Sequence, residues 1–268
     1  MESIDYILNY LLMENPKIRL KQEATTPQEK FNLYRSLCNI RPANKISEEY
    51  VQYEKKYLTW INNKKTITDM EDIETTDKTH PNNNLDNDDK IALWQGDITT
   101  LNIGAIVNAA NSQGLGCFVP GHNCIDNQIH TFAGIPLRLE CNEYMKTINY
   151  DLPTGEAFIT GAYNLPSEHI IHTVGPIIER SVTDKKRELL AECYTNCLKT
   201  AQENNVKSIA FCSISTGVFR FPKDIASQIA LRTVDGYLSD YGECFDKIVF
   251  NLYSDEDVKI YEESVTTH

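Results

Sequence analysis

The interpretation of residues 91–268 depends on one stretch, which reads Ala105-Ile106-Val107-Asn108-Ala109-Ala110-Asn111-Ser112. It begins as a short apolar run and ends in polar residues, a pattern typical of a buried strand followed by a loop. Five further segments are predicted to be strands: 91–94, 157–160, 170–173, 208–213 and 247–252. Helical patterns lie between them, at 126–133, 137–144, 184–204 and 222–238. Alternating strands and helices predict an α/β layered fold with a largely buried sheet.

Three polar segments follow predicted strands, and one of them is the end of the quoted stretch. They are 108–111, the Cys/His loop 117–124 and 213–219. In α/β sheets, ligands bind beyond the carboxyl ends of the strands, where such loops gather. The sequence therefore predicts that these three segments lie near one binding site.

The Cys/His loop has the residue types of a metal site. Cys117, His122 and Cys124 lie within eight residues, and Pro120 and Gly121 break both helix and strand, so the ligands can converge in a loop. Thiolate and imidazole together suit zinc, and three protein ligands would leave one position open for water or substrate, as in catalytic sites. The alternative is a coincidental cluster, because free cysteines are often simply small buried residues.

The other cysteines are interpreted as such small buried residues: Cys38, Cys141, Cys193, Cys197, Cys212 and Cys244. The chain begins Met1-Glu2-Ser3-Ile4-Asp5, without the basic start and apolar stretch of a signal peptide. Eight cysteines without such a signal favour reduced thiols and a cytoplasmic location. No apolar run is long enough to cross a bilayer, so a membrane partner is not expected.

The first part of the chain, residues 1–63, is predicted to be a helical extension packed on the main domain. Thr26 followed by Pro27 is typical of a helix start, and Ser47 is a candidate cap for a further helix. A separate domain of this size would be only marginally stable by itself.

Residues 64–90 differ from both neighbours and are predicted to be an acidic polar linker or loop. The part from Asp69 to Asp89 holds eight acids and one lysine. The main domain then occupies 91–268. The whole chain has 268 residues and a formal net charge of −12, which argues against nucleic acid as a partner, because non-specific affinity depends on basic groups. A local phosphate pocket built from backbone N–H groups remains compatible with this charge.

Seven stretches of the main domain, in order along residues 90–255, resemble a macrodomain, the ADP-ribose-binding α/β fold. The resemblance implies a three-layer α/β/α sandwich with a central mixed sheet. The stretches are Gly96-Asp97-Ile98-Thr99, Ala105 to Ser112, Ile125-Asp126-Asn127-Gln128-Ile129-His130, Ala133-Gly134, Pro153-Thr154-Gly155-Glu156-Ala157, Ile171-His172-Thr173-Val174-Gly175-Pro176 and Ser213-Ile214-Ser215-Thr216-Gly217-Val218-Phe219.

The chain departs from the commonest hydrolytic macrodomains at the Cys/His loop. Those proteins have a glycine-rich run before the Asp-x-x-Ile-His segment, whereas this chain has Cys117 to Cys124. In this it is similar to the zinc-dependent macrodomain branch of bacteria and fungi, which holds its metal with Cys-x4-His-x-Cys and carries an N-terminal helical extension. The resemblance implies a protein-ADP-ribose hydrolase that removes mono-ADP-ribose from acidic residues of target proteins. It also implies a sirtuin-type transferase as the enzyme reversed, and a lipoyl-carrier protein as the modified partner.

The resemblance assigns roles to individual residues. Asp97 would accept a hydrogen bond from the adenine amino group, with Ile98 offering its backbone; the alternative is a capping Asp. Asn111 would orient the distal ribose, whereas Asn108 would be structural or support a neighbour; a turn stabilised by Asn is the alternative. The substrate-binding set is completed by Cys124, Ile125, Asp126, Asn127, Ser215, Thr216, Gly217, Val218 and Phe219.

The loop 215–219 is expected to wrap the diphosphate, because Gly217 allows close backbone approach and successive N–H groups can hold an anion. Pro222 and Lys223 then open a helix whose N-terminus favours negative charge. Tyr253 is a candidate for stacking near adenine, and a core or surface tyrosine is its alternative.

Asp126 and Asn111 are the candidate catalytic residues. Asp126 would orient or deprotonate the attacking water, while Asn111 would hold the ribose in place. The alternative for Asp126 is an N-cap for the helix that follows, and both roles are compatible. His130 and His172 are interpreted as hydrogen-bonded structural histidines rather than ligands.

Three other functions use the same features. A reader module would bind ADP-ribose around a structural zinc without turnover. A hydrolase of O-acetyl-ADP-ribose would act on a small molecule instead of a protein. A zinc-dependent interaction protein would dock partners through its helical N-terminus and would not bind ADP-ribose.

Overall fold

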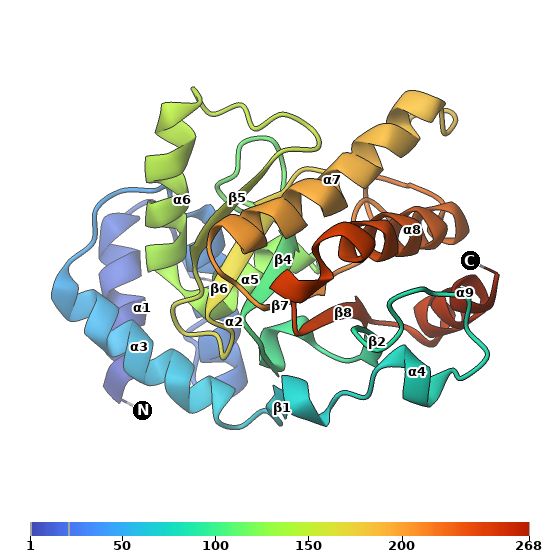
Figure 1. Cartoon of the computed structure of the whole chain (residues 1–268). Helices are drawn as coiled ribbons and strands as arrows, with labels where there is room; N and C mark the ends of the chain where they lie inside the picture. The colour runs from blue at the N-terminus through green and yellow to red at the C-terminus, as the bar shows by residue number, and fades with distance from the viewer. Residues whose placement is uncertain (1, 21, 268) are drawn as a thin grey trace.

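The computed structural model describes residues 2–20 and 22–267. The predicted strands form one six-stranded sheet in the order β2-β8-β7-β4-β6-β5, as seen in Figure 1. Neighbouring strands are parallel except β5 and β6, which run antiparallel, so the sheet is mixed as predicted. Their bounds are β2 (Ile91–Gln95), β4 (Ala105–Ala109), β5 (Ala157–Gly161), β6 (His169–Thr173), β7 (Ser208–Phe211) and β8 (Lys247–Leu252).

Helices cover both faces of this sheet and complete the three layers. On one face, α7 (Asp184–Glu203), α8 (Lys223–Tyr241) and α9 (Asp255–Thr266) pack side by side. On the other face, α5 (Ile125–Ala133) packs on β4 and α6 (Ile135–Thr147) packs on β5 (Figure 1). The predicted α/β/α sandwich is confirmed. Within the described residues, none of the helices combines the length and apolar character needed to span a membrane.

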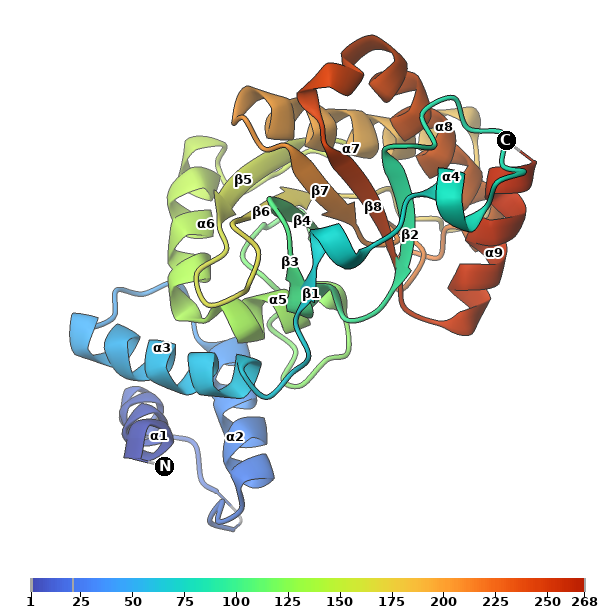
Figure 2. The ribbon, with the colours of Figure 1, turned by 60° about the horizontal axis from the view of Figure 1, so that its bottom comes forward.

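The predicted helices of the first part are present and form a second hydrophobic core of aliphatic and tyrosine side chains. They are α1 (Glu2–Glu14), α2 (Pro27–Ile40) and α3 (Glu48–Asn62), and Figure 2 shows them beside α5 and α6 at one end of the molecule. The predicted caps are confirmed: Thr26 forms a capping box with Glu29, and Ser47 accepts a hydrogen bond from the backbone of Tyr50. The boundary between an extension and a main domain stays a prediction.

A buried carboxyl group joins the extension to the sheet domain. Glu54 of α3 accepts hydrogen bonds from the hydroxyls of Tyr34 (2.9 Å) and Tyr50 (3.2 Å) and from the backbone N–H of Ile135 (3.0 Å). Burial raises the pKa of this carboxyl to about 7, against the opposing effect of its three hydrogen bonds. The start of α6 is therefore tied directly to the extension.

Residues 64–90, predicted as a linker or loop, pack against the sheet domain. Their short elements are β1 (Thr68–Asp69), η1 (Met70–Asp72) and α4 (Thr76–Thr79), and β1 pairs with β3 (Leu101–Asn102). Further along, the backbone N–H of Asn84 donates to the carbonyl of Val265 at the end of α9. Two other single turns, η2 (Ile98–Thr100) and η3 (Gly242–Cys244), complete the described elements.

Candidate active site

The three predicted segments meet at one cleft, beyond the carboxyl ends of the central strands. The cleft has a volume of about 830 Å³. It is lined by every residue of the predicted site except Asn127. Its lining also includes residues that the sequence did not single out as ligands, among them Gly175, Asn251 and Asp257. A single hollow thus joins the Cys/His loop to the loop predicted to hold phosphates.

The Cys/His loop brings its three ligand atoms together. The donor atoms of Cys117, His122 and Cys124 all lie within 4.8 Å of one another. The distance from Cys117 Sγ to His122 Nδ1 is 3.7 Å. Tetrahedral zinc with ordinary bond lengths would separate a sulfur and a nitrogen ligand by about 3.6 Å. All three side chains are partly exposed and line the cleft, and the donor set fits zinc.

Cys124 also caps helix α5. Its Sγ accepts a hydrogen bond from the backbone N–H of Asn127 at 3.4 Å. The helix begins at Ile125, so the alternative role of Asp126 as N-cap is wrong. Burial raises the pKa of the Cys124 thiol to about 12, and a bound cation would offset this by stabilising the thiolate.

Asp126 is nearly buried, with 4% of its surface exposed, yet it lines the cleft. Its Oδ1 accepts a hydrogen bond from Asn108 Nδ2 at 2.8 Å, and its Oδ2 accepts one from Asn111 Nδ2 at 3.4 Å. Burial raises the pKa of this carboxyl to about 6, while the Asn108 hydrogen bond and the charge of Arg138 oppose the shift. Asn108 therefore supports Asp126, as predicted, and does not line the cleft.

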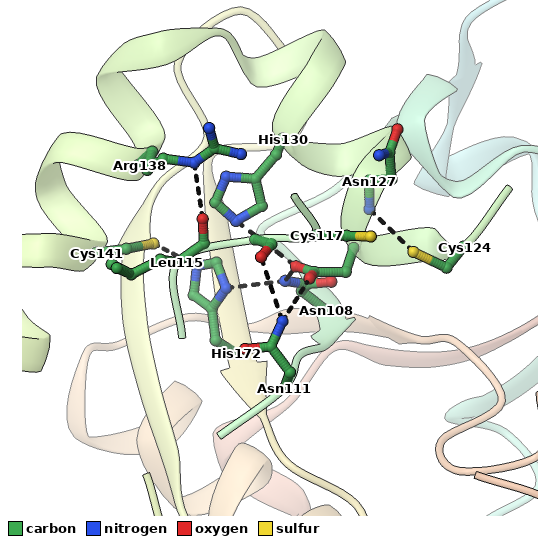
Figure 3. Close-up of polar contacts among 12 residues, drawn as sticks. Asn108, Asn111, Leu115, Cys117, Cys124, Asn127, His130, Arg138, Cys141 and His172 are labelled. Carbon is green, nitrogen blue, oxygen red and sulfur yellow. Dashed lines mark hydrogen bonds and ion pairs between the residues drawn. The ribbon is translucent and has the colours of Figure 1, made fainter. Parts of the chain in front are cut away.

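A chain of buried polar groups continues behind Asp126. The same Asn108 Nδ2 lies 3.1 Å from His172 Nδ1 (Figure 3). On the other side of the ring, His172 Nε2 lies 2.9 Å from Thr160 Oγ1. Because an amide nitrogen only donates, Nδ1 accepts and Nε2 carries the hydrogen. Burial lowers the pKa of His172 to about 3, which keeps the ring neutral. The interpretation of His172 as a hydrogen-bonded structural histidine is confirmed.

His130 differs from that interpretation. Neither of its buried ring nitrogens has a hydrogen-bond partner among the described residues. His130 Nε2 lies 3.6 Å from Asp126 Oδ1. Burial lowers the pKa of His130 well below its usual range. The imidazole packs closely against Gly116 instead. A Cβ added at Gly116 would lie only 2.8 Å from the ring.

Asn127 is placed differently from the prediction that it binds substrate. It is fully buried, and its side chain faces the extension instead of the cleft. Its Nδ2 donates to the carbonyl of Val119, and its Oδ1 accepts from the guanidinium of Arg35. Figure 3 shows Asn127 beside Cys124, where only its backbone N–H reaches the sulfur. Asn127 thus holds the Cys/His loop.

The loop 215–219 has the open backbone expected of a phosphate-binding turn. Ser215 has a positive φ of 66°, and its carbonyl accepts from the backbone N–H of Phe221. Among the residues that the structure describes, nothing lies within 4 Å of a Cβ built on Gly217, so this part of the turn is open. A Cβ on Gly175 would lie 2.0 Å from Ser215 Oγ, which explains why glycine stands there. Helix α8 starts next, at Lys223.

At the far end of the cleft, Asp97 has the capping role that was the alternative to adenine binding. Its Oδ1 accepts hydrogen bonds from the backbone N–H (2.9 Å) and the hydroxyl (2.6 Å) of Thr99, as in a capping Asp. Its Oδ2 lies 3.2 Å from Lys65 Nζ, and the residue still lines the cleft. Tyr253 also lines this end, and 82% of its surface is exposed. It is therefore a surface tyrosine placed where a flat ring could stack.

Comparison with known proteins identifies the fold and its relatives. The family profile described as Macro domain matches residues 107–230. A protein-ADP-ribose hydrolase of Treponema medium is 45% identical over 256 residues, which cover 96% of this chain and 95% of the relative. A probable bifunctional ADP-ribose hydrolase/ADP-ribosyltransferase of Fusarium oxysporum f. sp. cubense is 38% identical over 238 residues, covering 84% of this chain and 39% of the relative.

The solved structures agree with this assignment. The Trypanosoma brucei macrodomain in complex with ADP-ribose has 28% sequence identity and a TM-score of 0.66, and the comparison covers 91% of this chain and 97% of that one. The fold and its cleft define a macrodomain, and the chain belongs to the macrodomain family. Within that family it groups with enzymes, because relatives similar over nearly its whole length are protein-ADP-ribose hydrolases.

Proposed function

We propose that this chain is a zinc-dependent hydrolase that removes mono-ADP-ribose from acidic residues of target proteins. Its similarity to protein-ADP-ribose hydrolases supports the hydrolase class. The observation that carries the zinc-dependent part is the position of the three ligand atoms in the same cleft as Asp126. A structural metal would need no such opening toward a ligand space.

The chain's own residues supply binding, orientation and a proton acceptor. Cys117, His122 and Cys124 would hold the metal, which when bound would supply a Lewis acid beside the distal ribose. Asp126 would orient and deprotonate the attacking water, and its hydrogen bond from Asn108 fixes the carboxylate for this task. Asn111 would position the ribose, and its Nδ2 donates a hydrogen bond to Asp126 Oδ2 at 3.4 Å.

The substrate class follows from the same assignment. We propose that the modified protein is a lipoyl-carrier protein whose ADP-ribose was added by a sirtuin-type transferase. Support for a paired transferase comes from the Fusarium relative, whose name joins a hydrolase and an ADP-ribosyltransferase. The linkage attacked would be an ester to a carboxylate side chain.

The test separates hydrolysis from binding. Cys117→Ala and His122→Ala should abolish release of ADP-ribose from modified protein, while calorimetry still detects ADP-ribose binding, because the phosphate loop and Asp97 are untouched. Cys244→Ala is the matched control, since this partly exposed thiol does not line the cleft. Hydrolysis at the parent rate by the ligand variants would overturn the catalytic-zinc proposal. Binding without turnover by the parent would favour a reader, and turnover of O-acetyl-ADP-ribose alone would favour the small-molecule hydrolase.

A further inference from the structure

The metal loop, residues 117–124, has no helix or strand of its own. Its shape depends on side chains that reach in from outside and hold its backbone. Three such side chains each bind one backbone group of the loop: Asn127 Nδ2 donates to the carbonyl of Val119 (3.0 Å), the N–H of Gly121 donates to Asn39 Oδ1 (2.9 Å), and Arg35 Nη2 donates to the carbonyl of His122 (2.7 Å). Two of the three belong to α2 of the extension.

Arg35 makes a forked contact that a simpler cation cannot copy. Its Nε and Nη2 donate to Asn127 Oδ1 at 3.0 and 2.9 Å, while Nη2 also reaches the carbonyl of the candidate ligand His122. One guanidinium therefore fixes the backbone of a ligand against the helix that carries Cys124 at its start. Lysine has the charge but not the planar set of donors needed for both contacts.

Asn39 holds the turn before that ligand. Only 1% of its surface is exposed. Its Nδ2 also donates a hydrogen bond to Oγ1 of Thr131 in α5, at 3.4 Å. Gly121 has a φ of +66°, a conformation that favours glycine and aims its N–H at α2. The turn is thus shaped to meet a residue that lies 82 positions earlier in the chain.

The entry to the loop is tied to the same helix. Arg138 of α6 donates through Nε to the carbonyl of Leu115 (2.7 Å, Figure 3) and through Nη1 to the carbonyl of Cys38 (2.7 Å). Its guanidinium also lies over the ring of Phe118, 4.5 Å from the centroid. The end of α2, the start of the metal loop and α6 therefore form one connected unit.

We propose that α2 positions the metal loop, with Arg35 and Asn39 as the residues that hold its three ligands in converging positions. The inference rests on the zinc-dependent function proposed above and gives the helical extension a task in it. Fixing an irregular loop costs conformational freedom, and partners outside the ligand set remove that cost in advance. Without these contacts the ligand residues would remain, but they would bind metal less tightly.

The experiment measures zinc affinity directly. In competition with a coloured chelator, Arg35→Ala should bind zinc about 10- to 100-fold more weakly than the parent, the usual effect of losing a partner outside the ligand set. Arg35→Lys should restore little of this affinity, because it keeps the charge without the fork. The matched control is Lys30→Ala, which removes a positive charge from the same helix but whose partner is Asp5 of α1. ADP-ribose affinity should change by no more than about twofold in all three, since Arg35 does not line the cleft.

Asn39→Ala provides a second, independent variant in case Arg35→Ala does not fold, and it should weaken zinc binding in the same range. Zinc affinity equal to that of Lys30→Ala in the folded variants would overturn the positioning role. This result is distinct from failure of the proposed function. If the proposed function itself failed, the parent would bind no zinc, or Cys117→Ala would bind zinc as tightly as the parent.

Discussion

Two groups of side chains in this molecule combine the same two ligand types, thiol and imidazole, in different settings. The metal loop has Cys117, His122 and Cys124, and the buried group has His130, Cys141 and His172; in each group the donor atoms lie within 4.8 Å of one another. The first group is partly exposed and lines the cleft, whereas the second is buried, with His130 on α5, Cys141 on α6 and His172 on β6. Both groups combine thiols with imidazoles at the same close spacing, but they differ in their access to solvent and to the cleft.

Hydrogen bonding separates the two groups further. A metal on His172 Nε2 would place the ring hydrogen on Nδ1, where it would face the donating amide of Asn108. Turning that amide would direct its oxygen at Asp126. His172 of the buried group is thus committed, through Asn108, to supporting the Asp126 carboxylate. The comparison predicts one zinc site rather than two.

The largest effect is expected from replacing one cysteine of each group with alanine. Cys124→Ala should bring the zinc content close to zero and lower the hydrolysis rate by more than about a hundredfold, because it removes one of the three proposed ligands. Cys141→Ala should keep the zinc content of the parent and lose about 1–3 kcal/mol of stability through the small cavity that it leaves. Metal analysis and urea unfolding of both variants measure this contrast. Loss of zinc on Cys141→Ala would break the comparison.

A smaller effect is expected at the link between the buried group and the cleft. Asn108→Ala should lower kcat for hydrolysis by about tenfold to a hundredfold, a part of what a positioned general base contributes. KM and zinc content should stay near the parent values, because neither the metal loop nor the phosphate loop is touched. Steady-state kinetics on modified protein separates kcat from KM.

Thr160→Val is the control for that variant. It removes the partner of His172 Nε2 and leaves the hydrogen bond between Asn108 and Asp126 in place. Its stability should fall, but its kcat should stay close to that of the parent. Equal losses of kcat in the two variants would mean that Asn108 acts through general stability alone.

The smallest effect concerns pH. Burial lowers the pKa of His172 to about 3 in the folded protein, whereas an unfolded histidine has a pKa of about 6.5. Between these values the unfolded chain binds more protons, so this contribution to stability is complete above about pH 6.5 and is lost as the pH falls toward 3. His172→Gln cannot titrate. Urea unfolding at pH 7 and pH 5 should therefore show a smaller loss in the variant than in the parent, and parallel losses would exclude this role.

Much of the fold could be predicted because its signals are local. The six strands, the caps Thr26 and Ser47, and the converging ligands of the metal loop all follow from neighbouring residues. Helix α9 was missed although Ser254 and Asp257 form a capping box, which is a recognisable local signal.

The remainder depends on contacts between distant parts of the chain. Asn127 was predicted to bind substrate, but Arg35 lies 92 residues earlier and holds its side chain away from the cleft. His130 was expected to be hydrogen-bonded, yet the ring is enclosed by groups that bond elsewhere. No spacing or periodicity in the sequence indicates these contacts of Asn127 and His130. They emerge only when α2, α5 and α6 pack together.

The most direct test of the central claim is the zinc content of the purified chain, measured together with its hydrolysis of ADP-ribosylated protein before and after chelation. The structure leads us to expect about one zinc per chain, loss of hydrolysis when the metal is removed, and recovery when zinc is returned. A metal-free chain that hydrolyses the modified protein at the full rate would contradict the account.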